Sequence, residues 1–153
     1  MASLYGVEYT NAVNDVPSEK ALPNKWGSRL RSTYDSYTIL ADLAVGDKIY
    51  LGRLPKGARI IDVIVAFADL DTSGGTVDVG YEYADATLTD DLDGFASGID
   101  VTSAGAYSMS ADGANMAGFG YELTGETDIV VTTVGDTDAT SGDIKVCVIW
   151  AGA

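Results

Sequence analysis

Aspartates cluster at three places in the chain, and clustered carboxylates are typical ligands of divalent cations. The segment Asp69-Leu-Asp-Thr-Ser-Gly74 matches the first half of an EF-hand calcium loop, D-x-[DN]-x-[DNS]-G. A complete loop supplies a bidentate glutamate at its twelfth position, which is Gly80 here. Asp136-Thr-Asp-Ala-Thr140 is a weaker version of the same pattern. We interpret both segments as solvated turns and predict no bound metal.

The third cluster, Asp90, Asp91 and Asp93 before Gly94, would have to overcome its own charge repulsion to bind an ion, so we expect an exposed loop. Two carboxylates about 5–9.5 Å apart could also hydrolyse a glycosidic bond. With 23 acidic residues, such pairs arise by chance. An acid-dyad hydrolase therefore stays only as an alternative hypothesis.

The sequence lacks the other common catalytic residues. Histidine is absent, which excludes Ser-His-Asp and Cys-His catalysis and histidine-containing zinc sites. The single cysteine, Cys147, rules out an intrachain disulfide, and its place among valines predicts packing in a sheet. We predict that the protein is not an enzyme and needs no cofactor.

The net charge of −14 argues against nucleic-acid binding, because few bases are present to displace phosphate counterions. The charge is uneven: residues 1–60 carry +2 and residues 61–153 carry −16. The most apolar run, Ile60 to Ala68, is far shorter than the about 20 residues that span a bilayer. No signal peptide is recognised, so we expect cytoplasmic synthesis and no membrane partner.

Spacing and turn residues predict two parts: an extended N-terminal arm over residues 1–33 and a β-sandwich domain over residues 34–153. The arm has no regular period and contains Pro17 and Pro23. In the body, Val77, Val79 and Tyr81 alternate strictly with polar or small residues. Seven or eight strands at these spacings favour an all-β sandwich or barrel. We expect strands near residues 37–43, 48–51, 59–68, 76–83, 119–123, 127–134 and 143–150, and one or two short strands or a helical turn within 84–117.

Aromatic residues in the arm need a place to be buried, either on their own sandwich or on a neighbouring subunit. We favour the second interpretation, in which basic residues near the arm complement acidic patches on the partner. The candidate partner-binding residues are Tyr5, Tyr9, Trp26, Arg29, Arg31, Arg53, Lys56 and Arg59.

Four segments resemble head decoration, or cement, proteins of tailed bacteriophages. They are Leu4-Tyr-Gly-Val-Glu-Tyr-Thr10, Val16-Pro-Ser-Glu-Lys20, the stretch from Tyr34 to Val63, and the C-terminal hairpin that closes with Val146-Cys-Val-Ile-Trp150. The resemblance covers most of the chain, excludes residues 84–117, and contains no catalytic signature.

The resemblance implies a jelly-roll-like antiparallel β-sandwich, a homotrimer, and a position on the outer surface of the virion capsid. The implied partner is the major capsid protein, and the implied function is to stabilise the head by bridging capsomers. The alternative is a carbohydrate-binding or fibre-tip module of a virion, which needs exposed aromatic residues. Tyr81 and Tyr83 are candidates for that role, although they alternate like core residues.

Overall fold

Eight strands form two antiparallel four-stranded sheets that pack face to face. The computed structural model describes residues 27–71, 74–112, 117–135, 138 and 141–152. Sheet A has the order β1-β8-β3-β6 and sheet B the order β2-β7-β4-β5. Sheet A consists of β1 (Leu30–Ile39), β8 (Gly142–Ala151), β3 (Arg59–Phe67) and β6 (Gly105–Ser108), and sheet B of β2 (Lys48–Leu54), β7 (Thr127–Thr133), β4 (Thr76–Tyr83) and β5 (Asp91–Asp100).

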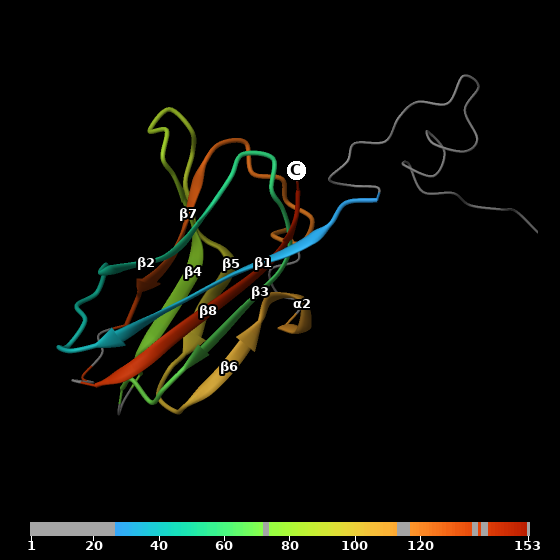
Figure 1. The fold of residues 1–153 in the computed structure, drawn as a ribbon. Coiled ribbons are helices and arrows are strands. Elements are labelled where there is room, and N and C mark those ends of the chain that lie inside the picture. The colour runs from blue at the N-terminus through green and yellow to red at the C-terminus, as the bar shows by residue number, and fades with distance from the viewer. Residues whose placement is uncertain (1–26, 72–73, 113–116, 136–137, 139–140, 153) are drawn as a thin grey trace, which may run out of the picture.

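The path of the chain between the sheets is that of a jelly roll. The chain changes sheet at every connection except the one between β4 and β5 (Figure 1). The first and last strands, β1 and β8, pair along their whole length. Eight antiparallel strands wound in this way form the double-sheet jelly roll. The predicted fold class is therefore confirmed.

The core lies between the sheets because the strands alternate apolar and polar side chains. In β4, Val77, Val79, Tyr81 and Tyr83 are all buried, whereas Asp78 and Glu82 on the opposite face are half-buried. The last strand, β8, follows the same rule: Ile144, Val146, Val148 and Trp150 are buried, as predicted. Successive side chains of a strand point to opposite faces, so this period places one row in the core.

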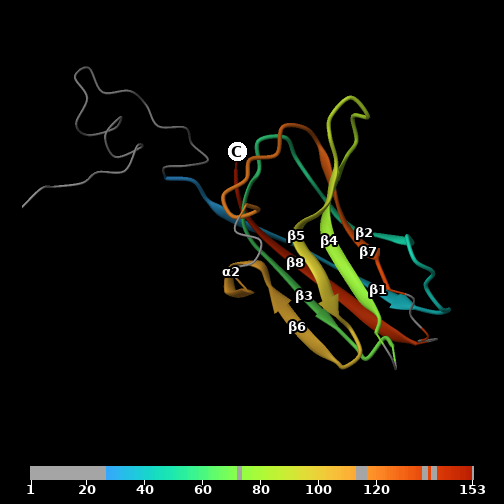
Figure 2. The same cartoon turned by 180° about the vertical axis from the view of Figure 1, so that it is seen from behind.

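The segment 84–117, which we left open, contains strands β5 and β6 and one helical turn, α2 (Met109–Asp112). The view from behind shows α2 beside the end of β6 and the β4–β5 connection projecting beyond the sheets (Figure 2). Strand β5 packs closely on β4, where a Cβ atom on Gly80 would lie 2.1 Å from the carbonyl oxygen of Asp91. Only glycine fits at this contact.

Four details differ from the sequence-based expectations. The strand expected over residues 37–43 ends at Ile39, and Asp91 and Asp93, expected in an exposed loop, lie in β5. The other two concern β1 and residues 119–123. Strand β1 begins at Leu30, so residues 30–33, assigned to the arm, belong to the sandwich and pair with Val148–Ala151 of β8. The expected strand at residues 119–123 is a turn with one isolated bridge, between Arg59 and Glu122. Gly120 adopts a positive φ of 74° there, which bends the chain out of an extended conformation.

Candidate partner-binding surface

The structure describes only five of the eight predicted contact residues. Tyr5, Tyr9 and Trp26 lie outside the described residues. The five basic residues come from separate elements of the fold. They are Arg29 before β1, Arg31 in β1, Arg53 in β2, Lys56 in the β2–β3 turn and Arg59 at the start of β3.

Arg53 is paired with carboxylates of its own chain. Its Nε lies 2.6 Å from Oδ1 of Asp128 and its Nη2 lies 2.7 Å from Oδ2, which is a bidentate ion pair. Glu126 adds a longer contact of 3.9 Å. The hydrogen bonds to Asp128 raise the pKa of Arg53 above its ordinary value. This guanidinium therefore links β2 to β7 within sheet B and is not free to bind an acidic residue of a partner.

Arg59 also has a structural role. Its guanidinium forms an ion pair with Glu122 and donates a hydrogen bond to the carbonyl oxygen of Gly120. The side chain is only 18% exposed. These contacts hold the connection before β7 against the start of β3, so Arg59 is not an exposed contact residue.

Arg31 covers part of the core. Its guanidinium carbon lies 5.5 Å from the ring centroid of Trp150, within the range of a cation–π contact. The indole N–H of Trp150 donates to Oγ1 of Thr33 at 3.2 Å. The guanidinium therefore lies over the face of the indole ring. Within the described residues, Arg31 forms no ion pair.

The β-sheet register gathers the basic residues at one end of sheet A. Leu30 pairs with Ala151, and Ala151 pairs in turn with Arg59, so the starts of β1 and β3 meet at the end of β8. Arg29 and Lys56 at this end are exposed and form no ion pair with the described part of the chain. Of the five predicted basic residues, these two are the most accessible to a partner.

The exposed apolar residues of β1 were missed as contact candidates by the sequence reasoning. Leu30 is 68% exposed, Tyr34 is 63% exposed and Tyr37 is 41% exposed, all on one edge strand. Large apolar side chains that stay in water on a single strand are typical of an interaction surface. The sequence did contain a signal for this surface. Tyr34 and Tyr37 lie on opposite faces of the strand, whereas a strand with one buried face needs aromatic residues on that face alone.

Both sheets carry an ion pair on the outer face, but one row of sheet A is uncharged. On sheet B, Nζ of Lys48 lies 2.7 Å from Oε2 of Glu82, which also accepts a hydrogen bond from the Tyr50 hydroxyl at 3.2 Å. On sheet A, the register places Tyr34, Cys147 and Ile64 in one row across β1, β8 and β3. This row is uncharged, although Lys145 and Asp143 form an ion pair elsewhere on the same face of sheet A.

The cluster over residues 136–140 lies mostly outside the described residues, and aspartates of each of the other two clusters form contacts within the fold. Oδ1 of Asp90 accepts a hydrogen bond from the amide of Tyr83 at 2.8 Å, so it fixes a strand end. Asp91 lies with Asp93 beside a cavity of about 290 Å³ that Tyr81 and Tyr121 also line. Partial burial, and then the hydrogen bond with Asp93, raise the pKa of Asp91. Within the described residues, no three His, Cys, Asp or Glu side chains lie close enough to hold a metal.

The predicted turn between β3 and β4 is confirmed as a connection, but it is less solvated than expected. Asp71 is 6% exposed, and its carboxylate accepts a hydrogen bond from the amide of Gly75. Tyr81 and Tyr83 are 5% and 6% exposed, so neither supplies the exposed aromatic platform that the carbohydrate-binding alternative needs.

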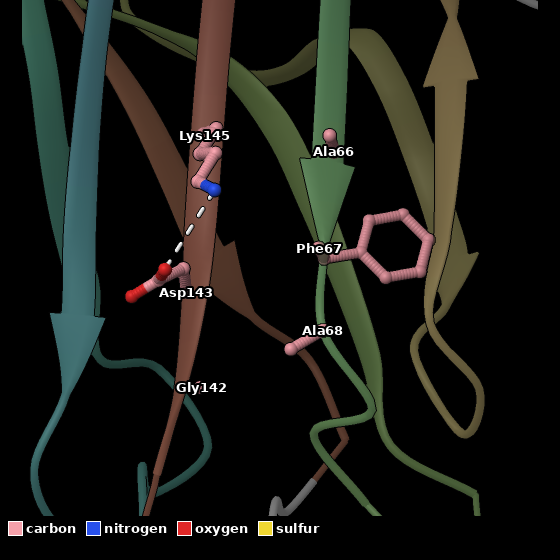
Figure 3. A pocket seen from close by; sticks show the side chains of 6 residues that line it. All are labelled: Ala66, Phe67, Ala68, Gly142, Asp143 and Lys145. Atoms are coloured by element: carbon pink, nitrogen blue, oxygen red, sulfur yellow. Dashed lines mark ion pairs between the residues drawn. The ribbon is translucent and has the colours of Figure 1, made fainter.

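A hollow of about 510 Å³ lies where β3 ends and β8 begins. Its walls come from alanines, glycine and Phe67, with Lys145 and Asp143 on the β8 side (Figure 3). The Lys145 ammonium lies 3.7 Å from the Asp143 carboxylate. No hydroxyl or thiol side chain is among the described residues that line the hollow. In the described part of the chain, no helix has the length and apolar character needed to cross a bilayer.

Comparisons with known proteins show which solved structures share this architecture. Neither a protein-family model nor a curated protein matches the sequence. A chain of the cyanophage Pam1 capsid asymmetric unit aligns with a TM-score of 0.65 and 21% identity, covering 93% of this chain and 99% of that one. A chain from the capsid of Ralstonia phage GP4 aligns with a TM-score of 0.60 and 22% identity, covering 80% and 85%. These likenesses show that the fold is shared.

Proposed function

We propose that this chain is a structural protein of a bacteriophage capsid, and more specifically a decoration protein that stabilises the assembled head. The observation that carries the proposal is the end-to-end match to a chain of the Pam1 capsid asymmetric unit, which covers 99% of that chain. The resemblance of four sequence segments to head decoration proteins points the same way.

The distribution of polar groups supports a binding role rather than catalysis. Three of the five basic candidate residues, Arg31, Arg53 and Arg59, serve contacts inside the chain. Three exposed large apolar residues, in contrast, lie on the single strand β1. In this proposal, the protein forms a homotrimer on the outer surface of the virion and binds the major capsid protein, while the arm anchors it through Tyr5, Tyr9 and Trp26.

A protein that binds assembled capsomers, but not separate subunits, stabilises the assembly by mass action. Several arms in one oligomer would add avidity, because each bound arm raises the effective concentration of the next. The acidic body would face solvent, where its net negative charge favours solubility.

The proposal is tested by sedimenting the purified chain with heads assembled from the major capsid protein of the same virus. We expect the intact chain to sediment with heads and not with free capsid subunits. A chain that stays in the supernatant at every concentration would refute the decoration role.

The matched truncation begins at residue 27 rather than residue 34, because Leu30–Thr33 pair with β8. We expect this truncated chain to stay folded and to lose attachment. Unchanged occupancy on heads would show that the arm is not the anchor.

A further inference from the structure

Strand β1 has one edge without a partner among the described strands. It is the terminal strand of sheet A, and all ten of its residues pair in an unbroken register with β8. Its other edge therefore presents a long row of backbone groups. Such an edge is a template for pairing with another strand.

The other three sheet edges are interrupted. Strand β6 is only four residues long. The register of β2 with β7 shifts between Tyr50 and Arg53, and the register of β5 with β4 shifts twice. Short or bulged edges are the usual protection against pairing. Among the described strands, β1 alone has a long regular edge, and it contains neither proline nor lysine.

One hydrogen bond shows which backbone groups of β1 point outward. The amide of Ser36 donates to Oδ1 of Asp35 at 2.8 Å, so this amide is directed away from β8. In an antiparallel pair, alternate residues point their backbone groups toward the partner strand or away from it. The free groups of β1 therefore belong to the even-numbered residues, which are Leu30, Ser32, Tyr34, Ser36 and Thr38.

Several antiparallel registers would bring the free groups of even-numbered residues of two β1 strands together, and one of them also pairs opposite charges. When Thr33 lies opposite Thr33 of the second copy, the free groups of Ser32 face those of Tyr34. The same register places Arg31 opposite Asp35, and it does so twice by symmetry. Neither Arg31 nor Asp35 forms an ion pair within the described residues. Opposite charges directly across two strands stabilise their pairing.

We propose that β1 is a homotypic docking strand through which two copies of this chain join their A sheets into one continuous sheet. The net charge of −14 makes most surfaces of two copies repel, whereas this edge pairs each acid with a base. The contact has two-fold symmetry, so each copy offers the same residues. It does not depend on a capsid, and in a trimer it would connect neighbouring trimers.

Cysteine cross-linking tests the register. Thr33 would form a non-hydrogen-bonded pair with its counterpart, with a Cα separation of about 4.5 Å, which suits a disulfide. In a Cys147→Ser background, we expect Thr33→Cys to give covalent dimers under mild oxidation. Ser36→Cys is the control, because two copies of Ser36 would lie roughly 20 Å apart in this register. Ser36 is the more exposed residue, so equal or greater cross-linking at Ser36 would overturn the proposal.

Charge reversal tests the same contact without a covalent bond. Asp35→Arg and Arg31→Asp each place like charges opposite one another, and we expect about tenfold or greater weakening of self-association by analytical ultracentrifugation. The double variant Arg31→Asp/Asp35→Arg restores the pairing and should associate like the unmodified chain. Asp35→Arg also lowers the net negative charge, which by itself would favour association. Failure of the double variant to recover, or no self-association of the intact chain at any concentration, would refute the proposal.

Discussion

The carboxylate of Asp62 on β3 accepts hydrogen bonds from both the amide and the hydroxyl of Ser110, at 3.0 Å each. Ser108 donates to the same carboxylate at 2.9 Å, and the amide of Val63 donates at 2.9 Å. An acidic residue in the most apolar run of the chain thus fixes the β6–α2 connection to sheet A. A carboxylate with this many donors is a strong local restraint.

Replacing Asp62 with alanine should therefore destabilise the protein by about 1 kcal/mol, because several donors lose a charged acceptor, although the exposed donors of Ser110 can bind water instead. Urea unfolding would measure the change. Asp42→Ala is the matched control, since Asp42 is exposed in the β1–β2 connection. If both variants lose the same stability, the hydrogen bonds to Asp62 contribute nothing specific.

Gly80→Ala should destabilise the sandwich by about 1–3 kcal/mol or more, because the added Cβ would overlap the backbone of β5. Gly105→Ala is the control, since its nearest contact would be an ordinary 3.4 Å to the Phe67 ring. Thermal unfolding of both variants would be compared with that of the parent. An unfolding temperature for Gly80→Ala equal to the parent's would mean that β4 and β5 separate without cost.

The raised pKa of Asp91 predicts a specific dependence of stability on pH. The folded chain holds this proton more tightly than the unfolded chain does, so stability falls as pH rises from the ordinary value of 3.8 through the raised pKa. An asparagine at position 91 has no carboxyl group, so it does not titrate in this pH range. The parent should therefore lose stability relative to Asp91→Asn between pH 3.8 and neutrality, as measured by urea unfolding at several pH values. A constant difference across this range would contradict the prediction.

Asp85 provides a control of the opposite sign. The amide and hydroxyl of Thr87 donate to its carboxylate and lower its pKa. Its contribution to stability is thus present above pH 3.8 and is lost as pH falls through the lowered pKa. Asp85→Asn should be less stable than the parent at neutral pH, and the two should converge in acid. If the two stabilities were equal at neutral pH and differed only in acid, the hydrogen bonds from Thr87 would not stabilise the charged form of Asp85.

If the chain acts as a decoration protein, heads assembled without it should release DNA at a lower temperature than complete heads. The reason is that contacts across capsomer seams add to the resistance of the shell against internal pressure. A dye that fluoresces on released DNA would follow the transition during heating. Adding the purified chain back should restore the higher temperature, and superimposable release curves would count against a stabilising function.

The strands that could be predicted from sequence are those with an uninterrupted period of two. In β4 and β8, the residues expected on one side are the ones that are buried. Strand β5 could not be placed, because two register shifts interrupt its alternation and leave Phe95 and Ala96, adjacent in sequence, both buried. The alternation of side chains along one segment does not reveal such register shifts, because they depend on the partner strand.

The converse error occurred at residues 119–123, where Phe119, Tyr121 and Leu123 alternate as in a strand. Phe119 is 48% exposed, and the chain turns at Gly120. The candidate site was predicted only in part for a related reason. From the sequence alone, Arg53 and Arg59 had no identifiable ion-pair partners. Their partners, Asp128 and Glu122, are far away in the sequence and come close only when the chain folds.

The pairing of Leu30 with Ala151 has a mechanical consequence. The start of the first strand and the end of the last strand emerge side by side, at the same pole of the molecule. A tensile load applied between these two points would separate β1 from β8 one residue pair at a time, beginning with Leu30 and Ala151. A load between the start of β1 and the start of β8 would instead strain all ten pairs in shear. The direction of pulling, more than the number of hydrogen bonds, would determine how much force the sandwich withstands.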